Sequence, residues 1–190
     1  EDRFDTAGLA GKFAVGCTGR VRAQKGTDLF VEAMIALLPH YPQWTAIITG
    51  RVTPEHEAFA AELRAQIEAA HLSDRILFLG EVDDVRLWYR RFTLFVAPSR
   101  NEGFGLTPLE AMASSTAAVT SDAGAYAEMI VSGKTGMVVA ADDGEALKNA
   151  IDVTARQIDN RYDFKGTSAK VELNEKDKVI TLWGDSDFQL

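Results

Sequence analysis

Short apolar runs alternate with longer stretches of helical periodicity along most of this chain. The apolar runs, rich in β-branched and aromatic residues, are 13–18, 45–49, 76–79, 94–97, 118–121 and 135–140. The helical patterns between them cover residues 28–38, 54–70, 85–90, 106–113 and 126–131. Strands and helices that alternate in this way build βαβ units on a parallel sheet. The sequence therefore predicts an α/β protein with an open, doubly wound, Rossmann-like parallel sheet.

The pattern changes near residue 142. Residues 144–162 form a long helical pattern that no parallel-strand signal follows. Residues 168–173 and 179–183 then alternate apolar and polar side chains on either side of a turn, which is typical of a β-hairpin. We expect two domains, residues 1–142 with the parallel sheet and residues 143–190 with an appended helix and hairpin.

Composition narrows the classes of partner. The 190 residues are 46% hydrophobic, enough for one well-buried domain, and the net charge of −8 disfavours a nucleic-acid partner. No apolar run approaches the ~20 residues of a membrane-spanning helix, so no membrane span is expected. Cys17 is the single cysteine, which excludes an intrachain disulfide and favours a cytoplasmic protein. The start at Glu1 is interpreted as an excised or engineered beginning.

The loop after the first predicted strand combines glycines with two cations. Gly19 and Arg20 follow the strand, and Lys25 stands just before a predicted helix. Glycine lets a backbone approach a ligand closely, and a helix N-terminus attracts anions. These residues suggest a diphosphate cradle without either standard phosphate-loop fingerprint. An ordinary turn with solvated charges is the alternative.

A second glycine-rich segment, residues 98–112, reads PSRNEGFGLTPLEAM. Gly103 and Gly105 flank the start of a predicted helix. The backbone N–H groups of Phe104, Gly105 and Leu106 can therefore point at a charged or hydroxylated ligand.

Two carboxylates belong to the same segment. Glu102 precedes the predicted helix, and Glu110 lies about two turns along it. Carboxylates accept hydrogen bonds from hydroxyl groups, so the pair suits a sugar at one end of a cleft and a ribose at the other. The alternative is that Glu102 is only a helix-entry residue and Glu110 a solvated helix position.

Arg20 with Lys25, followed by Glu102-Gly-Phe-Gly-Leu-Thr-Pro-Leu-Glu110, resembles the donor-binding domain of the family 4 retaining glycosyltransferases over about residues 12–142. This domain is the C-terminal half of a GT-B enzyme. The resemblance implies that Arg20 and Lys25 bind the donor diphosphate, that Glu102 is the catalytic residue at the transferred sugar, and that Glu110 contacts the ribose.

The resemblance also implies the rest of the site. The backbone of Phe104, Gly105 and Leu106 would hold phosphate and sugar, and residues 80–83 would border the base. The donor would be a UDP- or GDP-sugar, with no metal and no other cofactor, because cations stabilise the departing diphosphate. His71 replaces a usual glycine, and residues 115–117 replace a Gly-x-Pro turn. These departures concern loop geometry.

The tail has a different resemblance. Residues 146–190, above all 161–170, are similar to the N-terminal helix and hairpin of the YajQ-like family of small bacterial ligand-binding proteins. We interpret the chain as a chimera, artificial rather than natural. The strand at 135–140 could serve both parts.

Three functional hypotheses follow. In the first, the chain is the donor-binding half of a hexosyltransferase-type enzyme, which binds a nucleotide sugar but does not transfer it because the acceptor half is missing. In the second, it is an engineered fold chimera with no retained activity. In the third, it is a regulatory binding module centred on residues 161–170. An exposed hairpin edge could also support a dimer.

Overall fold

Six strands form one parallel sheet in the order β3-β2-β1-β4-β5-β6. The computed structural model describes residues 13–159, together with the strand backbones at 170–174 and 179–183. The strands of the large sheet are β1 Phe13–Thr18, β2 Trp44–Thr49, β3 Ile76–Gly80, β4 Leu94–Ala97, β5 Ala117–Ser121 and β6 Gly136–Val139. The predicted Rossmann-like parallel sheet is confirmed.

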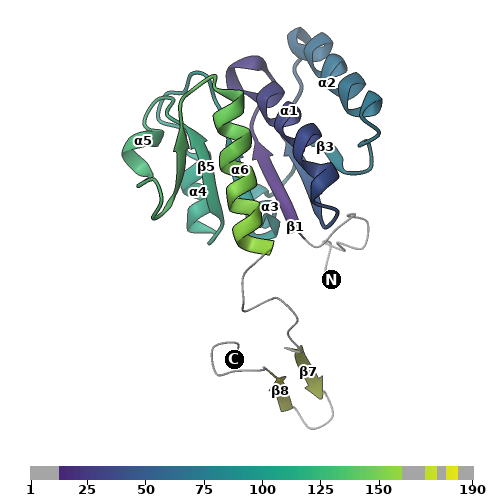
Figure 1. Cartoon of the computed structure of the whole chain (residues 1–190), viewed down its shortest axis with the longest axis vertical. Helices are drawn as coiled ribbons and strands as arrows, with labels where there is room; N and C mark the ends of the chain where they lie inside the picture. The colour runs from purple at the N-terminus through teal and green to yellow at the C-terminus, as the bar shows by residue number, and fades with distance from the viewer. Residues whose placement is uncertain (1–12, 160–169, 175–178, 184–190) are drawn as a thin grey trace. The chain divides into compact units, whose positions relative to one another are not determined.

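Helices cover both faces of this sheet. They are α1 Thr27–Leu37, α2 Glu57–Ala69, α3 Val85–Arg91, α4 Thr107–Ala113, α5 Tyr126–Met129 and α6 Gly144–Asp159. Short 3₁₀ turns occupy η2 Ala23–Lys25, η3 Leu38–His40 and η4 Pro54–His56. The helix α1 contacts α2, and α3 contacts α4. Figure 1 shows α6 in front of the sheet and α3 and α4 behind it.

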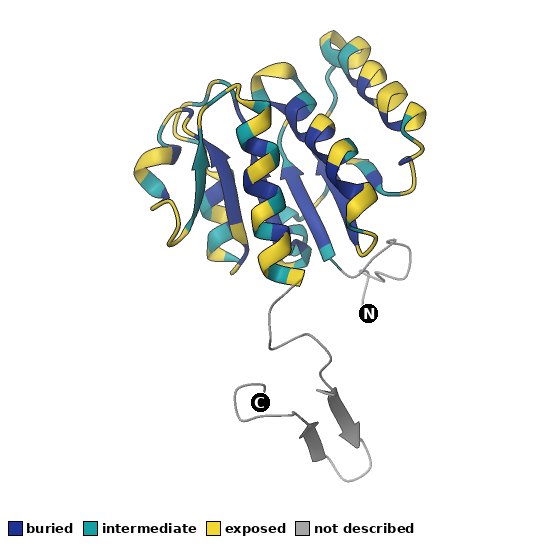
Figure 2. Ribbon diagram, viewed as in Figure 1, coloured by how far each residue is buried: buried dark blue, intermediate teal, exposed yellow. Residues whose placement is uncertain are grey.

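Burial follows from this layering. Every residue of β2 and β4 is buried, as expected for strands covered on both faces, and Figure 2 shows these strands in dark blue between helices with yellow outer sides. The inner side of α1 carries Phe30, Val31 and Met34, each at most 1% exposed. The helix therefore packs through a wide apolar face.

The strand order reverses between β1 and β4. Both strands lie in the middle of the sheet and pair in parallel, yet β1 leads to β2 on one side and β4 leads to β5 on the other. The loops that leave their carboxyl ends must diverge, and ligands of open α/β sheets bind in the crevice formed there. The loops after Thr18 and Ala97 are thus the first place to look for a site.

Two of the departures from the family pattern lie at helix ends. His71 and Ser115 have positive φ angles of 57° and 64°. Leu72 N donates to Ile67 O at 3.1 Å after α2, and Thr116 N donates to Ala111 O at 3.0 Å after α4. This is the left-handed helix ending that glycine normally occupies, which explains why a glycine is usual there.

By its internal contacts the chain divides into two compact units, Glu1–Ile151 and Asp152–Leu190. The predicted boundary after residue 142 stays a prediction. In the second unit, β7 Lys170–Asn174 and β8 Val179–Trp183 pair antiparallel, as the hairpin pattern predicts. Residues 161–169 of the third hypothesis lie outside the described residues.

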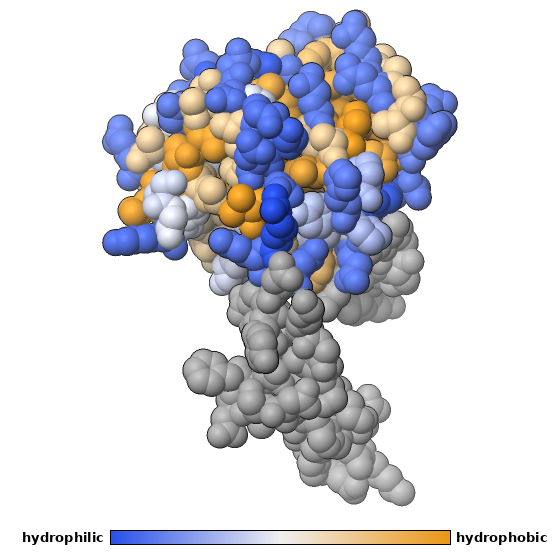
Figure 3. Space-filling model, viewed as in Figure 1, coloured by the Kyte–Doolittle hydropathy of each residue, from blue (hydrophilic) through white to orange (hydrophobic). Residues whose placement is uncertain are grey.

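The helix α6 is amphipathic. Leu147, Ala150 and Ile151 are at most 4% exposed, while Figure 3 shows a hydrophilic strip along its outer side in the middle of the view. Within the described part of the chain, no helix is long and apolar enough to cross a membrane. The cytoplasmic location, the absence of a nucleic-acid partner and a dimer through the hairpin edge stay predictions.

Candidate functional site

The loops after β1 and β4 meet at the point where the strand order reverses. Lys25 Nζ, from the first loop, donates a hydrogen bond to Glu102 Oε2 in the second, and the two charges form an ion pair. Their side chains are only 21% and 14% exposed. Two residues that the sequence places 77 positions apart therefore form one partly buried unit.

Glu102 has further partners. Ser99 Oγ and Tyr126 Oη each donate to Glu102 Oε2 at 3.3 Å. Burial acts to raise the pKa of Glu102, but the hydrogen bond and charge of Lys25, aided by the two hydroxyls, lower it below the usual range. Glu102 is therefore a carboxylate at neutral pH. Burial raises the pKa of Tyr126 to about 12, so its hydroxyl stays a donor.

Glycines permit the close approach of the two loops. Gly26 has a φ of 67°, and a Cβ at this position would lie 1.9 Å from Pro98 O, in the backbone of the second loop. Gly105 has a φ of 74°, and a Cβ there would lie 2.2 Å from the Tyr126 ring. A larger residue at Gly26 would force the two loops apart, and a larger residue at Gly105 would displace the Tyr126 ring.

Phe104, Gly105 and Leu106 form the outer rim of the second loop. The side chains of Phe104 and Leu106 are 62% and 57% exposed. Among the residues that the structure describes, the backbone N–H groups of these three residues donate to no carbonyl oxygen. Three consecutive backbone donors are thus available beside Glu102.

Gly19 and Arg20 form the start of the first loop. Gly19 has a φ of 146°, and the neighbouring Gly50 is so close that a Cβ on it would lie 1.9 Å from Gly19 O. Arg20 is exposed. Its guanidinium is a second cation in the same loop as Lys25, whose ammonium is held by Glu102.

Glu110 lies in the following helix, α4, and is exposed. Tyr89 Oη, from α3, donates to Glu110 Oε2 at 2.9 Å, and Tyr89 itself is fully buried. Burial, and then the hydrogen bond with this carboxylate, raise the pKa of Tyr89. The contact fixes one carboxylate oxygen at the edge of the core. Glu110 is therefore more than a solvated helix position.

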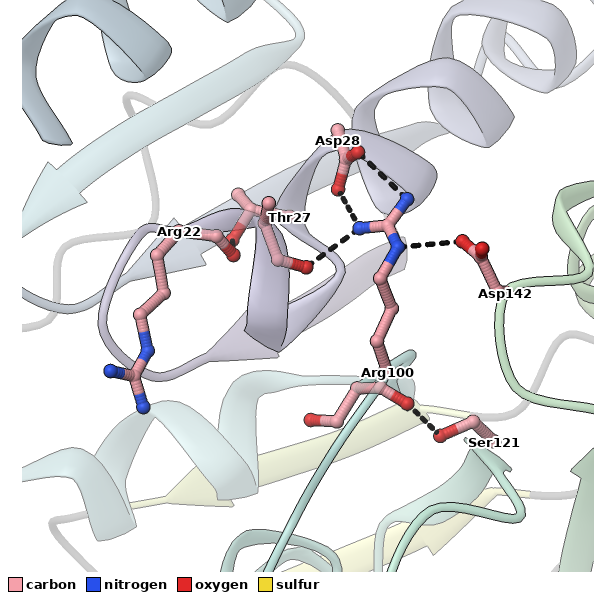
Figure 4. A network of polar contacts seen from close by, with 8 residues as sticks. Arg22, Thr27, Asp28, Arg100, Ser121 and Asp142 are labelled. Carbon is pink, nitrogen blue, oxygen red and sulfur yellow. Dashed lines mark hydrogen bonds and ion pairs between the residues drawn. The ribbon is translucent and has the colours of Figure 1, made fainter.

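Arg100 connects the second loop with two others (Figure 4). Its Nη1 and Nη2 donate to the two carboxylate oxygens of Asp28 at 2.7 and 2.9 Å, and its Nε donates to Asp142 Oδ1 at 2.6 Å. Nη1 also donates to Ala23 O at 2.6 Å. Asp28, and then Asp142, raise the pKa of Arg100, which stays charged.

The loop after β3 contacts the loop after β2, which in turn packs on Gly19. Gly50 N donates to Gly80 O at 2.7 Å, and Arg51 pairs with Glu81 at 3.2 Å on the surface. Residues 80–83, which the resemblance placed near a base, therefore neighbour the loop that packs on Gly19. The sequence gives no direct signal for this contact.

Cys17 belongs to the core and not to the two loops. Cys17 is 6% exposed in β1, and burial raises the pKa of its thiol to about 12, so it is an unreactive core residue. No cluster of three or more His, Cys, Asp or Glu side chains that could bind a metal occurs among the described residues.

Sequence reasoning did not assign roles to Tyr126, Tyr89, Asp28 or Arg100. Each acts through a partner that is distant in the chain, with separations of 24, 21 and 72 residues for the pairs Tyr126–Glu102, Tyr89–Glu110 and Arg100–Asp28. Only the position of Arg100 within the glycine-rich segment was a signal, because it lies two residues before Glu102.

Comparison with known families divides the chain. The family described as glycosyl transferases group 1 matches residues 12–156. The family described as nucleotide-binding protein YajQ-like matches residues 137–190. The two matches overlap over residues 137–156, which include most of β6 and most of α6.

Among curated proteins, the lipopolysaccharide core biosynthesis mannosyltransferase LpcC of Rhizobium leguminosarum bv. viciae is 70% identical over 151 residues, 80% of this chain and 43% of the relative. A nucleotide-binding protein of Dechloromonas aromatica is 92% identical over 48 residues, 25% of this chain and 29% of that protein. The chain thus spans less than half the length of either relative.

Solved structures agree with the first match. The C-terminal domain of the group 1 glycosyl transferase LpcC from Francisella tularensis has a TM-score of 0.77 at 36% identity, with 81% of this chain and 80% of that chain covered. Anabaena Alr3699/HepE, solved in complex with UDP and glucose, has a TM-score of 0.74 at 27% identity, with 81% of this chain and 41% of that chain covered.

Proposed function

The chain belongs to the group 1 glycosyl transferases, and from this premise we propose that its larger unit binds a nucleotide-sugar donor between the loops after β1 and β4. The observation that carries the proposal is the Lys25–Glu102 pair, which brings a cation and a carboxylate together at the reversal of strand order. A nucleotide sugar needs both, a cation for its diphosphate and an acceptor for its sugar hydroxyls.

The diphosphate would lie between Arg20 and Lys25. An ammonium has three hydrogen-bond donors, so Lys25 can keep its bond to Glu102 and still donate to phosphate oxygens. The free N–H groups of Phe104, Gly105 and Leu106 add uncharged donors from the second loop. Charge-assisted bonds contribute about 1.5–3 kcal/mol each, so the loss of either cation should weaken binding measurably.

The sugar would lie at Glu102 and the ribose at Glu110. Glu102 keeps one carboxylate oxygen, Oε1, outside its contacts with Lys25, Ser99 and Tyr126, which all use Oε2. Glu110 likewise keeps Oε1 outside its bond with Tyr89. Each glutamate is held through one oxygen and can accept a ligand hydroxyl with the other, and residues 80–83 would then border the base.

Mannose is the first sugar to test. The relative that is 70% identical over 151 residues is a lipopolysaccharide core biosynthesis mannosyltransferase, whereas the Anabaena relative was solved with UDP and glucose. The donor candidates are therefore GDP-mannose and UDP-glucose. We further propose that the 190-residue chain, tested alone, binds the donor without transferring the sugar, because it corresponds to 43% of that mannosyltransferase.

A second candidate rests on the two family matches. Residues 12–156 and 137–190 match unrelated families, and the 48-residue stretch is 92% identical to part of a nucleotide-binding protein. We propose that the chain is a chimera of the two, with domains 1–142 and 143–190. A chimera allows two alternatives to donor binding. One is an engineered fold without retained activity, and the other is a binding module at residues 161–170.

Thermal unfolding with GDP, UDP, GDP-mannose and UDP-glucose separates these functions. A ligand at 100 times its dissociation constant stabilises the folded state by about 2.7 kcal/mol. Donor binding predicts a rise in Tm that Arg20→Ala removes and Lys165→Ala leaves unchanged. A cooperative transition that no ligand shifts would contradict donor binding and support the inactive chimera. Sensitivity to Lys165→Ala alone would support the binding module.

A further inference from the structure

Arg100 joins three loops that all leave the carboxyl edge of the sheet. Its guanidinium contacts Ala23 from the β1–α1 connection, Asp28 from the first turn of α1, and Asp142 from the connection between β6 and α6, while its own backbone belongs to the β4–α4 loop (Figure 4). The side chain is 28% exposed. Arg100 therefore connects three separate segments, whereas an exposed ion pair joins two side chains and contributes little to stability.

The planar guanidinium of Arg100 can bond several partners at once. Two nitrogens face the two oxygens of Asp28 in a bidentate contact at 2.7 and 2.9 Å, and the third nitrogen faces Asp142 at 2.6 Å. Only a planar fork with several fixed donors can make these bonds at once. A lysine ammonium at the same position has its donors on a single nitrogen and could not reproduce the two parallel bonds to Asp28 while also reaching Asp142.

Backbone bonds run beside the side chain. Arg100 N donates to Gln24 O at 2.9 Å, and Gln24 Nε2 donates to Asn101 O at 3.3 Å. These contacts lie one residue before Lys25 and one residue before Glu102. The segment that Arg100 holds is therefore directly continuous with the ion pair of the candidate site.

We propose that Arg100 is a positioning residue whose bidentate bond to Asp28 keeps the β1–α1 and β4–α4 loops in the register that pairs Lys25 with Glu102. The inference rests on the proposed donor site for its functional consequence. Arg100 itself touches no part of the donor. It acts through the placement of the two residues that do.

The two acidic partners differ in weight. The Asp28 side chain is 23% exposed and lies in the first turn of α1, whereas the Asp142 side chain is 65% exposed. Solvent screens the second contact more strongly. We call the bonds of Arg100 to Asp28 and Asp142 the clamp. Asp28→Asn should therefore weaken the clamp more than Asp142→Asn does.

The test compares Arg100→Met, Arg100→Lys and Asp28→Asn with the parent. Arg86→Met is the matched control, because among the described residues Arg86 forms its ion pair with Asp84, two positions before it in the chain. Two quantities are measured, the Kd for GDP-mannose and for UDP-glucose by calorimetry, and the pKa of the Glu102 carboxyl by ¹³C NMR titration. The second needs no ligand.

Arg100→Met should weaken donor binding roughly tenfold to a hundredfold, since misplacement of site residues by about 1 Å has effects of this size. It should also raise the pKa of Glu102 toward its ordinary value, because Lys25 would no longer be held against it. Arg100→Lys should restore little of either, and Arg86→Met should change neither. Asp28→Asn should have the same effects as Arg100→Met. If Arg100→Met does not fold, Asp28→Asn provides the test.

Three results would overturn the proposal. A parent-like Arg100→Lys would show that charge and not the fork matters. An unchanged pKa of Glu102 in Arg100→Met or Asp28→Asn would show that the ion pair forms without the clamp. Unchanged donor affinity in these variants would remove its functional consequence. A parent chain that binds neither donor would contradict the proposed function alone, because the NMR titration decides the clamp without a ligand.

Discussion

Glu102 and Glu110 belong to one motif, yet the structure gives them different surroundings. Glu102 lies in a loop, is 14% exposed, and has a cation and two hydroxyls around one oxygen. Glu110 lies in α4, is exposed, and has a single hydroxyl partner, Tyr89. The first carboxylate is held by charge from another loop. The second is held by a neutral bond from the core.

The spacing of Glu102 and Glu110 in the motif therefore does not make the two carboxylates equivalent. The charge of Glu102 is balanced by Lys25, so its neighbourhood can change with ligand or pH. The bond of Glu110 to Tyr89 is set by helix packing, since α3 contacts α4 and Tyr89 is fully buried. We therefore expect large, charge-dependent effects at Glu102 and smaller, packing-dependent effects at Glu110.

The largest effect is expected for Lys25→Met. The variant loses a phosphate contact and also leaves Glu102 partly buried without its cation, so donor affinity should fall about tenfold to a hundredfold. Calorimetric titration measures this change. Lys148→Met removes a half-buried lysine that pairs with Glu145 in α6 and is the control. Equal donor affinity in parent and Lys25→Met would contradict the account of the Glu102 region.

Deletion of one hydroxyl at each glutamate sharpens the comparison. Tyr89→Phe removes the only partner that the structure gives Glu110 and should cost about 0.5–1.5 kcal/mol of unfolding free energy. Tyr126→Phe removes one of three partners of Glu102 and should cost less. Urea unfolding compares the two variants. A larger loss in Tyr126→Phe would break the proposed distinction.

Acid should act on the Glu102 region through its pKa. Burial opposes ionisation, but Lys25 lowers the folded-state pKa of Glu102 below its unfolded value. Such a group contributes stability above the unfolded pKa and loses it as the pH falls through the folded pKa. The difference in unfolding free energy between parent and Glu102→Gln should therefore be present at pH 6 and shrink as the pH falls below about 4. A difference that is constant with pH would contradict this assignment.

The smallest effect is expected at the far end of the helix that carries Glu110. Ser115 has a φ of 64°, a conformation that glycine adopts without strain. Ser115→Gly should stabilise the fold by about 0.5–1 kcal/mol, and His71→Gly after α2 should behave alike. Donor affinity should not change in either variant. Thermal unfolding and calorimetry check the two statements, and a loss of stability would show that other contacts of the side chain matter more.

The elements of the fold could be predicted from local pattern. The β2 and β4 segments are continuous apolar runs because both faces are covered, and the glycines of the two loops mark positions with positive φ or close approach. The apolar runs and the loop glycines are each visible in short stretches of consecutive residues. This is why the strands, the helices and the two loops could be located.

The contacts within the site could not be predicted in the same way. The sequence indicated Lys25 as part of a diphosphate cradle, but not its bond to Glu102, 77 residues away. Arg100 finds Asp28 at a separation of 72 residues. Such pairs depend on which loops the strand order brings together, and a single sequence carries no signal for one partner rather than another of the same charge.

Assigned ¹H–¹⁵N spectra of the chain, titrated with GDP-mannose and UDP-glucose, test the central claim most directly. The account predicts that the amide shifts of residues 19–26 and 102–106 change together and saturate with one dissociation constant. It also predicts that the groove beside β3, lined by Arg64, Ile67 and Phe78, stays unchanged. Shifts confined to that groove, or no shift at all with either donor, would contradict it.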